Sequence, residues 1–62
     1  MEKLVDEFNW VLRLLGDGID NLESVQAIYA NPSIETTLSD LRYARDRVAK
    51  LIEYFARLDE AT

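Results

Sequence analysis

The sequence predicts an all-α fold, an antiparallel two-helix hairpin that dimerises into a four-helix bundle. Three observations favour it. The chain has 62 residues, of which 48% are hydrophobic, with only two glycines and one proline, a composition typical of long helices rather than of turn-rich sheets. Apolar residues recur at alternating intervals of four and three, as in helices that pack along one seam. One strong helix stop, Asn31-Pro32, divides the chain near its centre.

The first helix is expected at about residues 2–30, because its apolar spacing continues in phase across Gly16-Asp17-Gly18. Each interior glycine costs about 1 kcal/mol relative to alanine, and Asp17 could cap a new helix. The alternative is therefore three short helices, with a break between Gly16 and Gly18. Two rows cross the glycines: a main seam of Leu4, Phe8, Val11, Leu15, Gly18, Leu22, Val25 and Tyr29, and a flanking row of Val5, Leu12 and Ile19.

A turn is expected at about residues 31–33, followed by a second helix at about 33–59. The residue before a proline is disfavoured in helical conformation, and proline suits the first position of a helix, so Asn31 can end one helix and cap the next. Ser33 is the alternative cap. The short link makes the two helices antiparallel neighbours. The seam expected for the second helix is Ile34, Leu38, Leu41, Arg45, Val48, Ile52, Phe55 and Asp59, with a flanking row of Thr37, Ala44, Leu51 and Leu58.

Folding the helices together about the Asn31-Pro32 bond pairs seam residues whose numbers sum to 63, and this places Gly18 opposite Arg45. A guanidinium at a seam needs a carboxylate or water, because burying an unpaired charge is costly. Asp17 and Asp20 flank the glycine. We expect these four residues to form a polar layer that specifies how the helices pair. The alternative is an anion or partner site at the same level.

The composition excludes several functions. The chain has no cysteine and no histidine, so thiolate and imidazole metal ligands are missing, and no motif for a nucleotide, a cofactor or a catalytic nucleophile is present. We therefore expect no enzyme activity, no catalytic residues, no cofactor and no metal. The net charge of −5 works against binding to anionic membranes, and no apolar run approaches the roughly 20 residues that cross a bilayer. A cytoplasmic protein is expected.

More apolar residues are present than a two-helix seam can cover, which is typical of helices in a larger bundle. Self-association is the simplest source of the missing helices. The expected function is that of a small regulator or interaction module, a homodimeric hairpin that binds another protein. The candidate dimer or partner surface comprises Trp10, Val5, Leu12, Ile19, Leu51 and Leu58.

The alternative function is nucleic-acid binding through basic and aromatic residues of the second helix. In outline the chain resembles the small dimeric helical hairpins that regulate plasmid copy number by binding paired RNA loops, which are similarly short, acidic and turned near the centre. That resemblance covers architecture only and implies RNA as the ligand of the alternative. The candidate nucleic-acid face is Arg42, Arg47, Lys50 and Tyr43, to which Tyr54 could add stacking.

Overall fold

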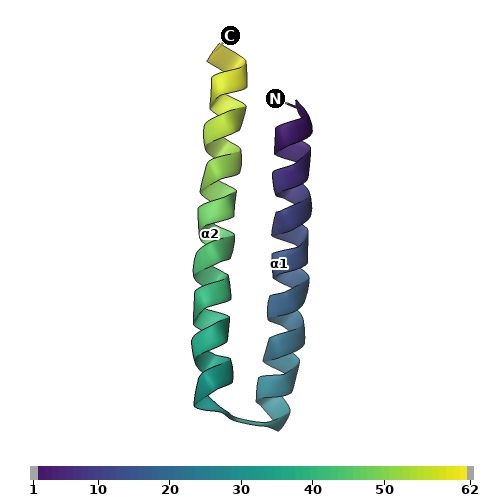
Figure 1. The fold of residues 1–62 in the computed structure, drawn as a ribbon, viewed down its shortest axis with the longest axis vertical. Coiled ribbons are helices and arrows are strands. Elements are labelled where there is room, and N and C mark those ends of the chain that lie inside the picture. Colours follow the sequence, from purple (N-terminus) through teal and green to yellow (C-terminus); the bar gives the residue numbers. More distant parts are fainter. Residues whose placement is uncertain (1, 62) are drawn as a thin grey trace.

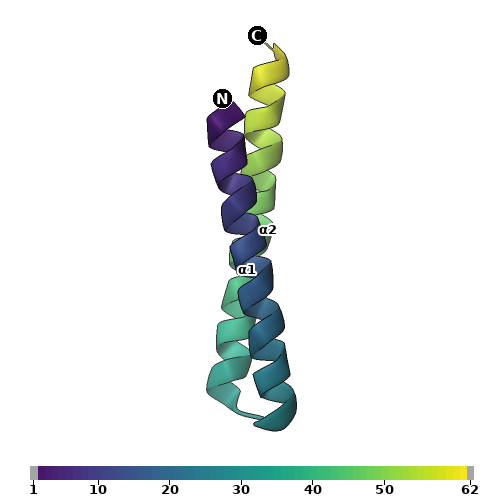
Figure 2. The same cartoon turned by 90° about the vertical axis from the view of Figure 1, so that its right-hand side faces the viewer.

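Two long helices make up almost all of the backbone that the computed structural model describes, residues 2–61; side-chain environments are described for residues 3–58. Helix α1 spans Glu2–Ile28 and helix α2 spans Pro32–Ala61. They run side by side in opposite directions and are joined at one end (Figure 1). The turned view shows that they cross at a shallow angle (Figure 2). The predicted all-α helical hairpin is confirmed, as a rod of 49 × 15 × 11 Å.

Helix α1 passes through both glycines without interruption. Among the described residues none has a positive φ, so Gly16 and Gly18 adopt ordinary helical backbone conformations. The alternative of three short helices is wrong. Two glycines cost about 1 kcal/mol each in helix propensity, whereas apolar packing against α2 continues on both sides of them and outweighs that cost.

The turn is held by hydrogen bonds around Asn31. Its side-chain oxygen accepts a hydrogen bond from the Ser33 backbone N–H at 2.8 Å, so Asn31 caps α2 and the alternative cap, Ser33, lies inside the helix. The Asn31 N–H in turn donates to the Gln26 side-chain oxygen at 3.2 Å. Helix α1 ends at Ile28, two residues earlier than expected, because the chain must leave the helix before the residue preceding Pro32. Helix α2 continues to Ala61, beyond the expected residue 59.

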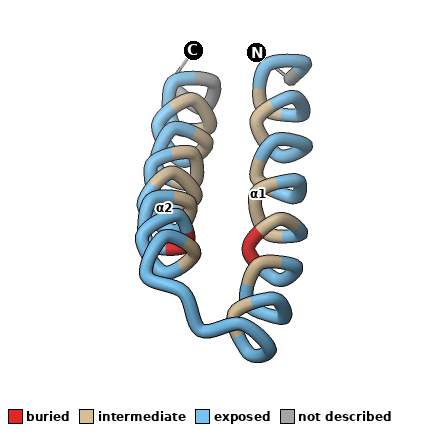
Figure 3. The backbone as a smooth tube through the Cα atoms, turned by 60° about the horizontal axis from the view of Figure 1, so that its bottom comes forward, coloured by how far each residue is buried: buried red, intermediate tan, exposed pale blue. Residues whose placement is uncertain are grey.

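The core is narrow, and its most buried side chains are Ile19 and Leu38, which are 1% and 3% exposed (Figure 3). Phe8 and Phe55 stack across the two helices with ring centroids 5.6 Å apart, which agrees with the expected pairing of residues whose numbers sum to 63. The observed seam between the helices is formed by two sets of residues. Those of α1 are Val5, Phe8, Leu12, Leu15, Ile19, Leu22 and Gln26, and those of α2 are Ile34, Leu38, Leu41, Arg45, Val48, Ile52 and Phe55.

The seam expected for α1 was therefore wrong in one of its two rows and also at Tyr29, which lies beyond the end of α1 and is 70% exposed. Asp59, the last residue of the seam expected for α2, lies outside the residues whose side chains are described. The row of Leu4, Val11 and Val25 is exposed, whereas the row of Val5, Leu12 and Ile19, expected to flank the seam, faces α2. The physical reason lies at the middle of the helix. Turning the Leu4 row inward would bury Gly18, which has no side chain, and would expose Ile19, whose burial is worth roughly 1.5–3 kcal/mol.

Candidate interaction surfaces

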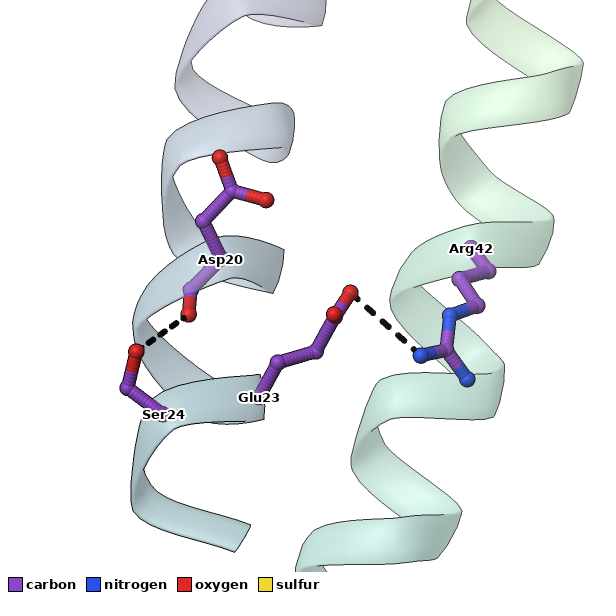
Figure 4. A network of polar contacts seen from close by, with 4 residues as sticks. All are labelled: Asp20, Glu23, Ser24 and Arg42. Atoms are coloured by element: carbon purple, nitrogen blue, oxygen red, sulfur yellow. Dashed lines mark hydrogen bonds and ion pairs between the residues drawn. The ribbon is translucent and has the colours of Figure 1, made fainter. Parts of the chain in front are cut away.

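The hairpin has two different broad faces, and one of them is polar. The helices are antiparallel. A residue that follows a seam residue by one position in α1 therefore lies on the same side of the hairpin as a residue that follows a seam residue by one position in α2. Glu23 and Arg42 each follow a seam residue by one position, and they meet on one side, with 3.4 Å between the Arg42 Nη2 and Glu23 Oε1 atoms (Figure 4). Both side chains are half exposed, so this ion pair is worth under about 1 kcal/mol. We call this side the polar face.

The opposite side carries an apolar row, whose residues precede by one position the seam row that contains Ile19 in α1 and the seam row that contains Leu38 in α2. In α1 these are Leu4, Val11, Gly18 and Val25; in α2 they are Thr37, Ala44, Leu51 and Leu58. Leu14 lies beside them, three residues after Val11. The five leucines and valines of α1 and α2 at Leu4, Val11, Val25, Leu51 and Leu58 are 39–41% exposed, and Leu14 is 51% exposed. We call this set of residues the apolar face.

The expected polar layer does not form an ion pair. Arg45 is half-buried at the seam, as the pairing predicted, but Asp17 and Asp20 are exposed, and within the described residues no salt bridge joins either of them to Arg45. Gly18 does not make room for Arg45 either, since a Cβ atom added to Gly18 would meet nothing within 4 Å. Asp20 instead receives a hydrogen bond on its backbone carbonyl oxygen, from the Ser24 hydroxyl at 3.1 Å (Figure 4).

The residues proposed for the dimer or partner surface lie in three separate parts of the hairpin: its core, its apolar face and the outer side of α1. Val5, Leu12 and Ile19 face α2 and belong to the core of the hairpin, so the expectation that they remain uncovered is wrong for the fully buried Ile19. Leu51 and Leu58 lie on the apolar face. Trp10, 54% exposed, precedes Leu12 by two positions, about 200° around the helix, and so points away from α2.

The proposed nucleic-acid residues also separate. Arg42 lies on the polar face beside Glu23, whereas Tyr43, Arg47 and Lys50 are exposed and share the outer side of α2. Tyr54 and Arg57 extend that side at the same helical spacing, and the two tyrosines are 68% and 57% exposed. Arg57 is partly neutralised by Glu53, 3.8 Å away. We call Tyr43, Arg47, Lys50, Tyr54 and Arg57 the outer stripe of α2; Arg47 and Tyr54 form its edge toward the apolar face, because each precedes a seam residue by one position.

Sequence reasoning missed two features of these surfaces. Leu4, Val11 and Val25 were assigned to the seam, although the parallel row through Ile19 has the same period. Arg57 was not included in the basic set, although it follows Tyr54 by three residues and Lys50 by seven. Helical spacing alone could have found Arg57, whereas the choice between two in-phase rows needs the position of the partner helix.

Within the described residues, no group of three or more acidic side chains is arranged to hold a metal ion. In the same part of the chain neither helix combines the length and the apolar character needed to cross a membrane. Comparisons of the chain with protein-family models, with curated proteins and with solved structures find no match. The surfaces themselves are therefore the basis for a functional proposal.

Proposed function

We propose that the chain is a small cytoplasmic, non-enzymatic interaction module that works as a homodimeric helical hairpin and binds another protein. The apolar face is the observation that carries this proposal. It is as long as the hairpin's own seam and has the same heptad spacing, but no part of the described chain covers it. Large exposed apolar patches of this kind mark association sites in proteins.

The exposed area supports a partner of about the same size. The hairpin exposes 4953 Å² for a mass of 7.2 kDa. A compact monomer of this mass exposes about 4,100 Å², so the hairpin exposes roughly 850 Å² more. Stable protein interfaces bury about 800 Å² on each partner. Covering the apolar face with a second hairpin would bring the exposed area per chain to the value expected for a compact domain.

Sedimentation equilibrium at micromolar concentration tests the dimer. The unmodified chain should sediment with twice its monomer mass, and Leu51→Gln should shift the equilibrium toward monomer, because it places an amide in the apolar contact. Tyr43→Gln is the matched control: it removes an exposed apolar side chain from the same helix but from the outer stripe, and should leave the dimer intact. A monomer for the unmodified chain would refute the dimer.

Trp10 is the candidate anchor for the partner protein. Tryptophan is enriched at the energetic centres of protein interfaces. Trp10 projects from α1, a helix with six carboxylates against Lys3 and Arg13. Co-purification followed by mass spectrometry should recover a partner with the unmodified chain and lose it with Trp10→Ala, while the dimer persists. An unchanged set of captured proteins for Trp10→Ala would contradict this role.

The outer stripe of α2 favours a second candidate function, the binding of single-stranded RNA. Alternating cations and exposed aromatic rings along one helix side provide phosphate contacts and base stacking. Binding of a fluorescent RNA, followed by anisotropy, should weaken with added salt and disappear in the double variant Arg47→Gln, Lys50→Gln. Arg42→Gln, on the polar face, is the control that should keep binding. An absence of binding by the unmodified chain at low salt would exclude this candidate.

A further inference from the structure

The apolar face can be covered by a second hairpin in two symmetric ways, and they differ in which helices meet. If the two turns lie at the same end, α1 of one copy packs on α2 of the other. If the turns lie at opposite ends, α1 packs on α1 and α2 on α2. Both arrangements satisfy the two-fold symmetry that most homodimers have. The distribution of charge and side-chain size along the face distinguishes them.

The charges favour contact between unlike helices. The charged residues that border the apolar face are Glu7, Asp40 and Arg47, each of which precedes a seam residue by one position, whereas Asp6, Asp20 and Glu23 follow seam residues and lie on the polar face. Opposite-end packing would bring Arg47 near its own copy, because this residue lies close to the middle of α2. Like-charge juxtaposition opposes association. Same-end packing instead sets Arg47 level with Leu14 of the second copy, so that it meets no like charge there.

Side-chain size along the face agrees with this choice. Phe8 stacks on Phe55, which sets the level at which residues of the two helices lie. In same-end packing Leu4 then lies level with Leu58 of the second copy and Val11 with its Leu51, so large apolar side chains meet at the open end. Gly18 lies level with Ala44 of the second copy, and two small residues let the helix axes approach closely. Same-end packing also sets Val25 level with Thr37 of the second copy, whereas opposite-end packing would set Leu58 against Thr37 and Gly18 near Val11, so that Gly18 no longer faces a small residue.

Gly18 provides an independent observation. A glycine inside a helix costs about 1 kcal/mol, and a Cβ added at Gly18 would meet nothing within 4 Å beyond its own stretch of helix; the same holds for Gly16, but only Gly18 lies on the apolar face. Its backbone conformation is helical, so it is not needed for a turn. A helix of a second copy that approaches at this level would occupy that space.

We propose that a second copy of this chain covers the apolar face with the two turns at the same end, so that α1 of each copy packs against α2 of the other. This inference rests on the proposed homodimer and specifies its geometry. Every neighbouring pair of helices in the resulting four-helix bundle is antiparallel. Trp10, Tyr43, Lys50 and Arg57 remain on the outside, available to another partner.

Spin labels at single cysteines test the arrangement, because the natural chain contains no cysteine. Ala30→Cys labels the exposed turn and Arg57→Cys labels the exposed side of α2 near the open end. In same-end packing each label should lie on the order of 20 Å from its copy, because packed helix axes are about 8–10 Å apart. In opposite-end packing the Ala30 labels would be separated by nearly the 49 Å length of the hairpin.

Mixing the two labelled chains gives the reciprocal measurement. A long distance between Ala30 of one copy and Arg57 of the other is expected, and a short one would overturn the same-end arrangement while leaving the dimer in place. Sedimentation of the labelled proteins separates the two kinds of failure. A dimer with long Ala30–Ala30 distances refutes the geometry alone, whereas a monomer without any intermolecular distance refutes the homodimer on which the geometry rests.

Discussion

Replacing each of the two glycines of α1 by alanine should have the same effect on the stability of the hairpin but different effects on its dimerisation. Gly16 and Gly18 lie in the same helix, both partly exposed, and a Cβ atom added to either would meet nothing within 4 Å in the hairpin. Replacing either by alanine should therefore stabilise the isolated hairpin by about 0.8–1.0 kcal/mol through helix propensity. For a domain of this size a gain of about 1 kcal/mol raises the Tm by roughly 4–8 °C.

Only Gly18 lies on the apolar face, since Gly16 is displaced toward the polar face. In the proposed dimer the Cβ of Gly18→Ala would enter the contact with the second copy, and such overpacking costs about 1–3 kcal/mol. The dimer dissociation constant should then rise roughly 5-fold to 140-fold. Gly16→Ala should leave it unchanged.

Sedimentation equilibrium gives the two dissociation constants, and thermal unfolding followed by circular dichroism at low concentration gives the hairpin stabilities. If both variants were stabilised equally and dimerised equally, no second helix would approach at Gly18. If neither variant were stabilised, the helical conformation of this segment would be in question.

Three further predictions concern the hairpin itself and are measured by urea unfolding. Ile19→Ala should lower the free energy of unfolding by about 2–5 kcal/mol, because it removes the most buried side chain; a loss below that of Tyr43→Ala, which truncates an exposed side chain away from the apolar face, would contradict the assignment of the core. Asn31→Ala should cost about 0.5–2 kcal/mol through loss of the hydrogen bond from the Ser33 N–H, and Asn31→Asp, which keeps a side-chain oxygen as the acceptor, should cost less. Glu23→Gln should change stability by less than about 1 kcal/mol, and a larger loss would mean that its ion pair with Arg42 is less solvated than its half exposure indicates.

Local chemistry explains why so much of the fold could be predicted. A proline excludes helix at the residue before it and lacks an N–H, so the stop at Asn31-Pro32 depends on no distant contact. The phase of the apolar residues across Gly16 and Gly18 likewise indicated one helix, because a period is a property of the sequence itself. The pairing of Phe8 with Phe55 followed from the short turn and the two seams.

The surfaces depended more on tertiary structure. Arg42, Arg47 and Lys50 are close in sequence and appeared as one basic set, but Arg42 lies beside Glu23 on the polar face while the other two lie on the outer stripe. Likewise, Asp17 and Asp20 are adjacent to Gly18 in sequence yet do not pair with Arg45. Neighbours in sequence lie about 100° apart around a helix, so adjacency does not predict which side chains meet.

The sequence by itself determined two helices, their boundaries to within two residues, and an excess of apolar surface, because propensity, capping and periodicity are encoded locally. Only the tertiary structure decided which of two in-phase rows of α1 faces α2. Both rows repeat every seven residues, so the period alone does not show which of them packs against α2. The rows differ in the side-chain volume that they place between the two helices. At the middle of the hairpin Ile19 fills the space that Gly18 would leave empty.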